Sequence, residues 1–291
     1  MQIAPQFGFG LELVSDIPVP GAVEVADGEQ SPVIRIVIGG LHKASGEAKF
    51  IREDNVIVYC HPTGDFRCFA DRIEIAPGEP LDFEDLGALL VANVLPALLW
   101  QRGAFVLHAA CVSLPNGLTI AIAGPSGTGK SRLAASFVEG GAQLIGDDSL
   151  ALSISDGSVL ASGLPGGWFS RGKDSPNREL VSTPVGQAGG TIKLDVLAVL
   201  GEAGPDSAQL APLAALECLM QNRHRPQVPA LLGLQGQVLD HAVTIARRLP
   251  LVRLIPCLGS NRDLALMRSA MVRLARKAHC GNPDFDAATG K

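Results

Sequence analysis

GPSGTGKS, at residues 124–131, is the most informative motif in the sequence. It has a glycine, four residues, and then Gly-Lys-Ser, a pattern typical of loops that wrap the phosphates of a nucleotide. The segment before it, LTIAIAG, predicts an apolar strand, and the segment after it, SRLAASFVEG, predicts a helix. Glycines let successive backbone N–H groups point inward at a helix N-terminus, where they bind anions. The motif therefore predicts a phosphate-binding loop within an α/β fold.

Each residue type in this loop has an expected role. Lys130 places a positive charge on the β- and γ-phosphates of ATP, and the Ser131 hydroxyl can ligate Mg²⁺. Transporter ATPases carry in addition an L-S-G-G-Q-like signature and a later apolar strand ending in Asp-Glu, and this sequence has neither. The expected nucleotide contacts are Gly124, Pro125, Ser126, Gly127, Thr128, Gly129, Lys130, Ser131 and Arg132.

A pair of carboxylates, Asp147 and Asp148, follows the apolar run QLIG one predicted helix after the loop. A strand beside the loop strand would bring both to the γ-phosphate. Neighbouring residues on a strand face opposite ways, which suits two roles: one carboxylate at the metal and one accepting a proton from a hydroxyl nucleophile. The alternative is that GDDS is only a polar turn.

One histidine, His108 in VLHAAC, precedes the loop on the strand before a predicted hairpin at PNG. Histidine is the side chain best suited to proton transfer near neutral pH, so His108 is a candidate catalytic residue. A histidine packed in the core is the competing interpretation.

Composition limits the class of protein. The chain has 291 residues, 47% hydrophobic and 18% charged, and a formal net charge of −5, which favours a globular protein without a general attraction to nucleic acid or anionic membranes. The six cysteines show no C-x-x-C pair and no zinc-site spacing. The most apolar stretch, residues 86–100, contains Asn93 and Pro96 and is shorter than the about 20 residues of a membrane span. We therefore expect a buried helix interrupted near Pro96, no signal peptide, and a cytoplasmic location.

Two domains and a tail are predicted. Residues 1–83 contain short strands with Pro/Gly turns and form a β-rich N-terminal domain. Residues 84–280 form the domain that carries the phosphate loop, with 84–101 as a linking helix, and 281–291 form a disordered tail. A last helix with one apolar face is predicted from the spacing of Leu264, Met267, Met271 and Leu274.

Together, His108, the hairpin, the loop and the Asp pair resemble the HPr kinase/phosphorylase family, whose catalytic domain is akin to phosphoenolpyruvate carboxykinase. The resemblance implies an HPr-kinase-like α/β domain preceded by the β-rich domain, and phosphotransfer from ATP with Mg²⁺. It implies that Asp148 is the general base on an acceptor serine, that Ser131 and Asp147 hold the metal, and that His108 and Lys130 lie at the reacting phosphate.

More of the chain resembles one branch of these proteins, in the opening FGFGLELVSDIPVPG, in QRGAFVLHAACV and in LPLVRLIPCLGSNRD. That branch includes kinases that phosphorylate a serine on ribosomally made precursors, notably lasso peptides. The expected partner is therefore a peptide or small protein, with no nucleic acid and no membrane, and a homo-oligomer is left open. Two alternatives stay open: an HPr-type kinase/phosphorylase acting on a sugar-transport carrier protein, and a nucleotide-binding sensor or scaffold with little catalysis.

Two segments have no assigned role. HPr kinases carry a Glu-Ile-Arg-Gly-type signature after the Asp pair, where this chain has GLPGGWFSRGKDSPNREL. Arg171, Lys173 and Glu179 are loose candidates to replace it, against the alternative of an ordinary loop. The basic run QNRHRP, with Arg223, His224 and Arg225, could contact an acidic peptide or phosphate, but a solvated loop is the favoured interpretation.

Overall fold

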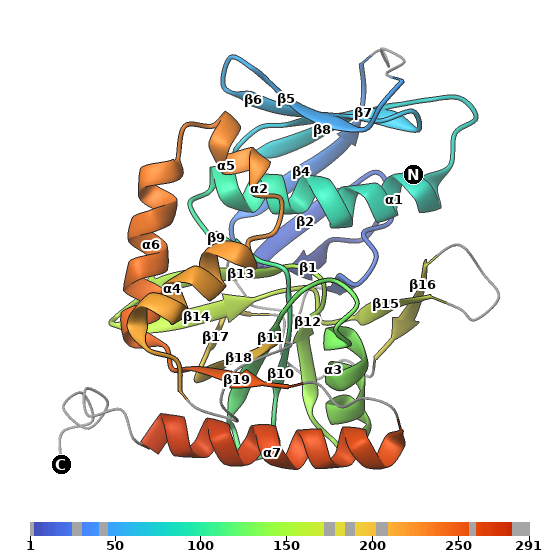
Figure 1. Cartoon of the computed structure of the whole chain (residues 1–291). Coiled ribbons are helices and arrows are strands. Elements are labelled where there is room, and N and C mark those ends of the chain that lie inside the picture. Colours follow the sequence, from blue (N-terminus) through green and yellow to red (C-terminus); the bar gives the residue numbers. More distant parts are fainter. Residues whose placement is uncertain are drawn as a thin grey trace.

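The structure is a computed structural model that describes residues 3–24, 31–40, 46–171, 178–183, 190–201, 209–255 and 260–280. In these residues the chain forms a mixed α/β fold with sheets of eight, five and four strands and a two-stranded hairpin. Figure 1 places the largest sheet at the top, the helix of residues 83–101 beneath it, and the smaller sheets below that helix. The predicted α/β class is confirmed at this level. Free thiols are carried by Cys60, Cys68, Cys111 and Cys218.

The eight-stranded sheet is built from the first part of the chain, in the order β3-β1-β2-β4-β8-β7-β6-β5. β2 pairs in parallel with β4 and β4 with β8, and the other neighbours are antiparallel. Burial alternates along β2, as expected for a strand with one covered face. All eight strands fall inside the predicted N-terminal domain, whose boundary at residue 83 stays a prediction. They are β1 (Gln6–Gly8), β2 (Leu11–Ser15), β3 (Val23–Glu24), β4 (Val33–Ile38), β5 (Lys49–Glu53), β6 (Val56–Cys60), β7 (Gly64–Cys68) and β8 (Arg72–Pro77).

The helix under this sheet consists of α1 (Phe83–Leu89), a π-helical turn η1 (Leu90–Val94) and α2 (Leu95–Gln101). Asp82 caps it, because its carboxylate accepts the backbone N–H groups of the second and third helical residues. Pro96 has no N–H to give to the carbonyl four residues earlier, that of Ala92, and its ring crowds that carbonyl. The predicted interruption near Pro96 is therefore a widened turn, and the helix continues past it.

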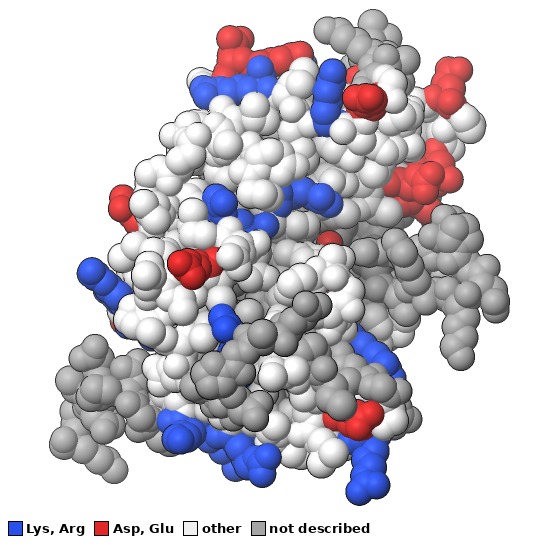
Figure 2. All heavy atoms as spheres, viewed as in Figure 1, with Lys and Arg blue, Asp and Glu red and all other residues white. Residues whose placement is uncertain are grey.

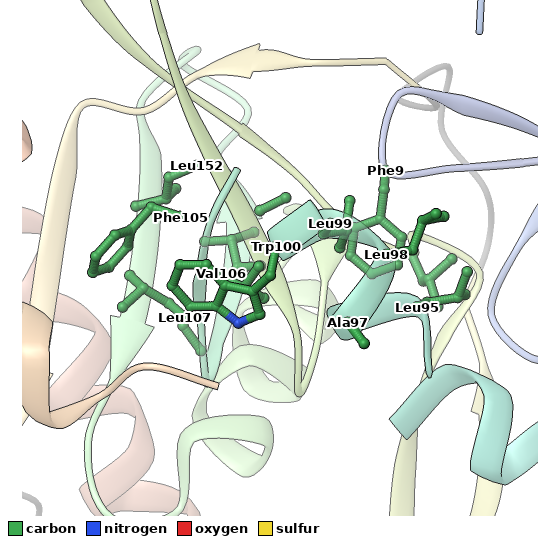
Figure 3. Close-up of a cluster of buried hydrophobic side chains, with 14 of the residues drawn as sticks. Phe9, Leu95, Ala97, Leu98, Leu99, Trp100, Phe105, Val106, Leu107 and Leu152 are labelled. Carbon is green, nitrogen blue, oxygen red and sulfur yellow. The ribbon is translucent and has the colours of Figure 1, made fainter. Parts of the chain in front are cut away.

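By length and composition the segment Phe83–Gln101 could cross a membrane, but 67% of its most apolar window is buried inside the fold. In Figure 3, Leu98 and Leu99 lie toward Phe9, and Trp100 lies toward the side chains of β9. The rings of Trp100 and Phe105 meet edge to face, with centroids 5.6 Å apart. The segment is a core helix, as expected.

The five-stranded sheet carries the phosphate loop, and its order is β12-β10-β11-β18-β19. β10 is antiparallel to both of its neighbours, whereas β11, β18 and β19 run in parallel. Its strands are β10 (Ala109–Ser113), β11 (Thr119–Ala123), β12 (Gln143–Gly146), β18 (Val196–Leu200) and β19 (Leu251–Leu254).

Helices α3 (Lys130–Glu139) and α7 (Asn261–Cys280) cover one face of this sheet (Figure 1). The apolar face predicted for the last helix is confirmed, because Leu264, Met267 and Met271 are buried there and Leu274 is partly buried. The opposite face of the sheet joins the main core together with the N-terminal sheet and the remaining elements. These are β9 (Phe105–Leu107), β13 (Leu150–Ser155), β14 (Ser158–Ser162), β17 (Ile192–Lys193), and helices α4 (Pro212–Gln221), α5 (Gln227–Leu231) and α6 (Gln235–Arg248). The hairpin of β15 (Gly167–Arg171) and β16 (Arg178–Ser182) lies by α3 instead, where Trp168 packs against the cluster under α3 and α7.

Two expectations about the strands are wrong. The segment FVLHAACVSL is not one strand, because it breaks at His108 into β9, which pairs with β13, and β10, which belongs to the five-stranded sheet. The strand before the Asp pair, β12, does not lie beside the loop strand β11, because β10 lies between them. The tight hairpin at Asn116 and Gly117 folds β10 back beside β11 and leaves β12 at the edge.

Candidate nucleotide-binding and catalytic site

The predicted phosphate loop lies between a strand, β11, and a helix, α3, the local context that the sequence predicts. Gly124 has a φ of 148°, and a Cβ there would lie 2.6 Å from the Leu200 carbonyl oxygen, so only glycine fits. Gly127 and Gly129 also have positive φ, at 84° and 88°. The Thr128 hydroxyl donates to the Pro125 carbonyl across the loop at 2.8 Å. Ser126 is exposed at the loop, and Arg132 is exposed on the first turn of α3.

Lys130 begins α3 and is buried, with 7% of its surface exposed. Its ammonium donates to the carbonyl oxygens of Gly124 at 2.8 Å and Pro125 at 3.1 Å. The positive charge of Lys130 is therefore held at the start of the loop. The glycines of the same loop leave room for a phosphate group to approach its backbone. A buried ammonium beside a helix N-terminus suits the binding of phosphate oxygens.

Ser131, the residue after Lys130, pairs with Asp147. The Ser131 hydroxyl donates to the Asp147 carboxylate at 2.9 Å. Burial raises the pKa of Asp147 to about 6, and the hydrogen bond from Ser131 opposes that rise. A hydroxyl and a carboxylate are hard oxygen donors of the kind that Mg²⁺ prefers, so the pair fits a Mg²⁺ ion in its chemistry.

Asp147 and Asp148 follow β12 rather than lying on it, because the strand ends at Gly146. The expectation of alternating strand faces is therefore wrong. Asp148 instead has a left-handed backbone, with φ 66°, a conformation that Asp tolerates better than most residues. This turn sends the two carboxylates to different partners: Asp147 to Ser131, and Asp148 to His108.

His108 lies at the break between β9 and β10 and faces Asp148. Its Nδ1 is 3.0 Å from the backbone oxygen of Asp148 and 3.4 Å from the carboxylate Oδ1. Burial lowers the pKa of His108, and the charge of Asp148 partly opposes this. Both neighbours of Nδ1 are acceptor oxygens, so the tautomer with the proton on Nδ1 satisfies them. His108 is therefore paired with a site carboxylate and is not an isolated core histidine.

His224, in the basic run for which a solvated loop was the favoured interpretation, lies beside His108. Its ring centroid is 5.2 Å from that of His108, and its Nδ1 is 2.8 Å from the Ser149 hydroxyl. Burial lowers the pKa of His224 to about 3. His108, Asp148 and His224 each offer a ligand atom within 4.8 Å of the others. Two imidazoles and one carboxylate suit a transition-metal ion better than Mg²⁺.

The backbone of the 222–224 segment is fixed by the core, so QNRHRP is not the solvated loop that we expected. The His224 N–H donates to the Val106 carbonyl at 2.8 Å, and the His108 N–H donates to the Asn222 carbonyl at 2.8 Å. The indole N–H of Trp100 donates to the His224 carbonyl at 2.8 Å. These bonds add the segment to the edge of β9. The cluster of basic residues in the sequence was the one available signal.

A cleft of about 660 Å³ opens over this cluster. His108, Asp148 and the first loop residues, Gly124 to Ser126, line one part of it, the 221–227 segment lines a second, and α1 and η1 line a third. The volume lies in the range of sites for small molecules and short peptide segments. Of the residues with no assigned role, Lys173 lies outside the described residues, as do the side chains of Arg171 and Glu179.

No protein-family model matches this sequence, and no curated protein matches it. Among solved structures, the chain is similar to the HPr(Ser) kinase/phosphatase from Coxiella burnetii, with 14% sequence identity and a TM-score of 0.35. The match covers 63% of this chain and 96% of that one.

Proposed function

We propose that the protein is an ATP- and Mg²⁺-dependent serine kinase. The observation that carries the proposal is the convergence of two pairs at one phosphate loop: Ser131 with Asp147, and Asp148 with His108. Binding of a nucleotide with Mg²⁺ requires only the first pair, whereas the second pair supplies a carboxylate that can act as a base. A hydroxyl and a carboxylate at a metal position, next to a separate carboxylate held by a histidine, are the groups that phosphoryl transfer to a hydroxyl requires.

In this mechanism the loop amides and Lys130 hold the phosphates of ATP. Ser131 and Asp147 would hold Mg²⁺, which would supply positive charge against the phosphate oxygens. Asp148 accepts the proton of the acceptor serine hydroxyl as that oxygen forms a bond to the γ-phosphorus and the bond to the ADP oxygen breaks. His108 donates to Asp148 and keeps its carboxylate oriented. Lys130 and the loop amides take up the charge that develops on the leaving phosphate oxygens.

The proposed acceptor is a ribosomally made precursor peptide of the lasso type. This rests on the sequence resemblance of the opening segment, of QRGAFVLHAACV and of LPLVRLIPCLGSNRD to that branch of HPr-kinase-like proteins. A cytoplasmic location belongs to the same proposal, because both ATP and a newly made precursor are found there.

Single-turnover transfer of labelled γ-phosphate from ATP to serine peptides, across Mg²⁺ concentrations, tests the proposal. Formation of phosphoserine by the wild-type protein, and not by Lys130→Ala, supports the proposal. Rapid reversal by inorganic phosphate would point to the kinase/phosphorylase alternative. ATP binding without acceptor-dependent turnover would point to the sensor and would refute the kinase.

A further inference from the structure

The cleft has a wall that comes from the N-terminal part of the chain. Asp85, Ala88, Leu89 and Ala92 line it from α1 and η1. Their spacing of three, four and seven residues places them on one helix face. The facing wall is the 221–227 segment, and the floor is His108, Asp148 and the start of the phosphate loop. A molecule in this cleft would therefore contact Asp148 and His108 directly.

Most of the phosphate-binding groups are not part of this cleft. It touches the loop at Gly124, Pro125 and Ser126, and neither Lys130 nor Ser131 lines it. Phosphates held by Lys130 and the N-terminus of α3 would lie beside the cleft and not fill it. The two alanines on the helical wall leave space, and Leu89 and Pro226 add apolar surface. Such a cleft suits an extended peptide segment that presents a hydroxyl at Asp148.

Arg223 is the cation available to such a segment. Its Nε donates to the Met220 carbonyl at 2.7 Å, and no described carboxylate forms an ion pair with it. Burial lowers the pKa of Arg223, so its guanidinium is partly removed from water. The neighbouring guanidinium of Arg225 is directed to the Ala92 carbonyl. Figure 2 shows Lys and Arg side chains across the middle of the viewed face of the molecule. Asp and Glu side chains lie toward its right edge, at the level of α1, whose first turn contains Glu84 and Asp85.

We propose that this cleft binds the acceptor as an extended peptide and that Arg223 selects an acidic side chain close to the acceptor serine. The proposal rests on the kinase function above and names its substrate class. A carboxylate meeting a partly buried guanidinium makes a charge-assisted hydrogen bond, and the geometry of Arg suits carboxylates. We expect an acidic residue to tighten binding by about 10- to 100-fold over its amide, the usual range for such bonds.

The test measures, by fluorescence anisotropy, the binding of fluorescein-labelled serine peptides to the full chain. Mg²⁺ and a non-hydrolysable ATP analogue are present, so that no phosphate is transferred during the measurement. The probes are matched ten-residue peptides in which one of the three residues on either side of the serine is Glu, Gln or Lys. The expected order is Glu tighter than Gln and Gln tighter than Lys at one or more positions. Arg223→Gln should abolish the Glu preference, and Arg223→Glu should reverse it in favour of Lys.

Arg247→Gln is the matched control, because Arg247 lies exposed in the last turn of α6. The preference should survive in that variant. Equal binding of the Glu, Gln and Lys peptides by the wild-type protein would overturn the proposal. So would an unchanged preference in Arg223→Gln, or a loss of ATP affinity in that variant, which would assign Arg223 to the nucleotide. Binding is measured separately from transfer, so a protein that prefers acidic peptides but transfers no phosphate would refute the kinase and leave the cleft assignment standing.

Discussion

The guanidinium of Arg225 donates two hydrogen bonds, at 3.0 and 2.8 Å, to the carbonyl oxygen of Ala92. In an α-helix that carbonyl would receive the N–H of the residue four positions later, which here is Pro96 and has no N–H. Arg225 supplies donors in its place. The residue next to the site histidine His224 is thereby tied to the π-helical turn of the N-terminal helix.

Removing Arg225 should destabilise the protein, because Ala92 then keeps a carbonyl that Pro96 cannot satisfy. Arg225→Ala is expected to lower the free energy of unfolding by about 1.5–3 kcal/mol, the range for hydrogen bonds to charged groups. In a Pro96→Ala background the loss should be smaller by about 1 kcal/mol, because the new N–H can bond to the carbonyl. Urea unfolding of the two single variants and the double variant measures this coupling. Additive effects would show that Pro96 does not create the need for Arg225.

Lys130→Ala should weaken ATP binding and abolish phosphoryl transfer, because the ammonium at the start of the loop is lost. Calorimetric titration with ATP and the serine-peptide assay give the two readouts. Arg247→Ala is the control, since it also removes one positive charge and Arg247 is exposed in the last turn of α6. Normal affinity and normal turnover in Lys130→Ala would rule out the phosphate loop as the nucleotide site.

Asp148→Asn keeps the size of the side chain and its tolerance of a left-handed backbone, but it removes the basic oxygen. If Asp148 is the general base, ATP with Mg²⁺ should bind with near-normal affinity while transfer falls about 10²- to 10⁴-fold. Single-turnover kinetics, with nucleotide binding measured separately, tests this. Full activity in both Asp148→Asn and Asp147→Asn would mean that the Asp pair is a structural turn.

Asp147→Asn and Ser131→Ala should share a different phenotype, because the two side chains form one oxygen pair. Each should raise the Mg²⁺ concentration needed for half-maximal transfer, and high Mg²⁺ should partly restore the rate. A Mg²⁺ titration of transfer in both variants provides the comparison. If Asp147→Asn instead shows the pattern expected of a lost base, the two carboxylates have exchanged roles.

His224 should make the protein sensitive to acid. Its pKa is about 3 in the folded chain, against an ordinary value of 6.5, so between these values the unfolded chain binds a proton that the folded chain does not. Stability therefore falls as pH falls from about 6.5 toward 3, by up to about 1.4 kcal/mol per pH unit from this group. After burial, the groups that act on it are Asp148, which opposes the shift, and Arg225, His108 and Lys130, which add to it.

His224→Gln should reduce that slope while keeping a partner for the Ser149 hydroxyl. Urea unfolding at pH 5 and pH 7 compares the wild type with the variant, and His241→Gln on α6 serves as the matched control. An identical difference in stability between the two pH values in wild type and His224→Gln would show that His224 does not titrate in this way.

The parts of the site that the sequence predicts are those determined by neighbouring residues. The phosphate loop depends on glycines that adopt positive φ between a strand and a helix, and all of these signals lie within a few residues of one another. The N-terminal strands and the last helix were likewise visible as apolar periodicity. The break at His108 was not visible, because β9 and β10 are both apolar and only their partners place them in different sheets.

The role of the 221–227 segment could not be predicted for a related reason. His224 meets a serine 75 residues earlier, and Arg225 meets a carbonyl 133 residues earlier. Periodicity and turn signals carry no information about such distant partners, so a run of basic residues was interpreted as a solvated loop. The Asp pair is a mixed case: we predicted that its two side chains point in different directions, but a left-handed turn, and not a strand, separates them.

That left-handed turn also limits which residues can replace Asp148 in other chains with this fold. With φ at 66°, glycine and asparagine fit the backbone readily, whereas a β-branched residue would be strained. A descendant that gave up catalysis but kept its architecture would therefore be expected to carry Gly or Asn at this position. If Asp148 is the general base, the identity of this single residue would distinguish chains that transfer phosphate from chains that only hold a nucleotide.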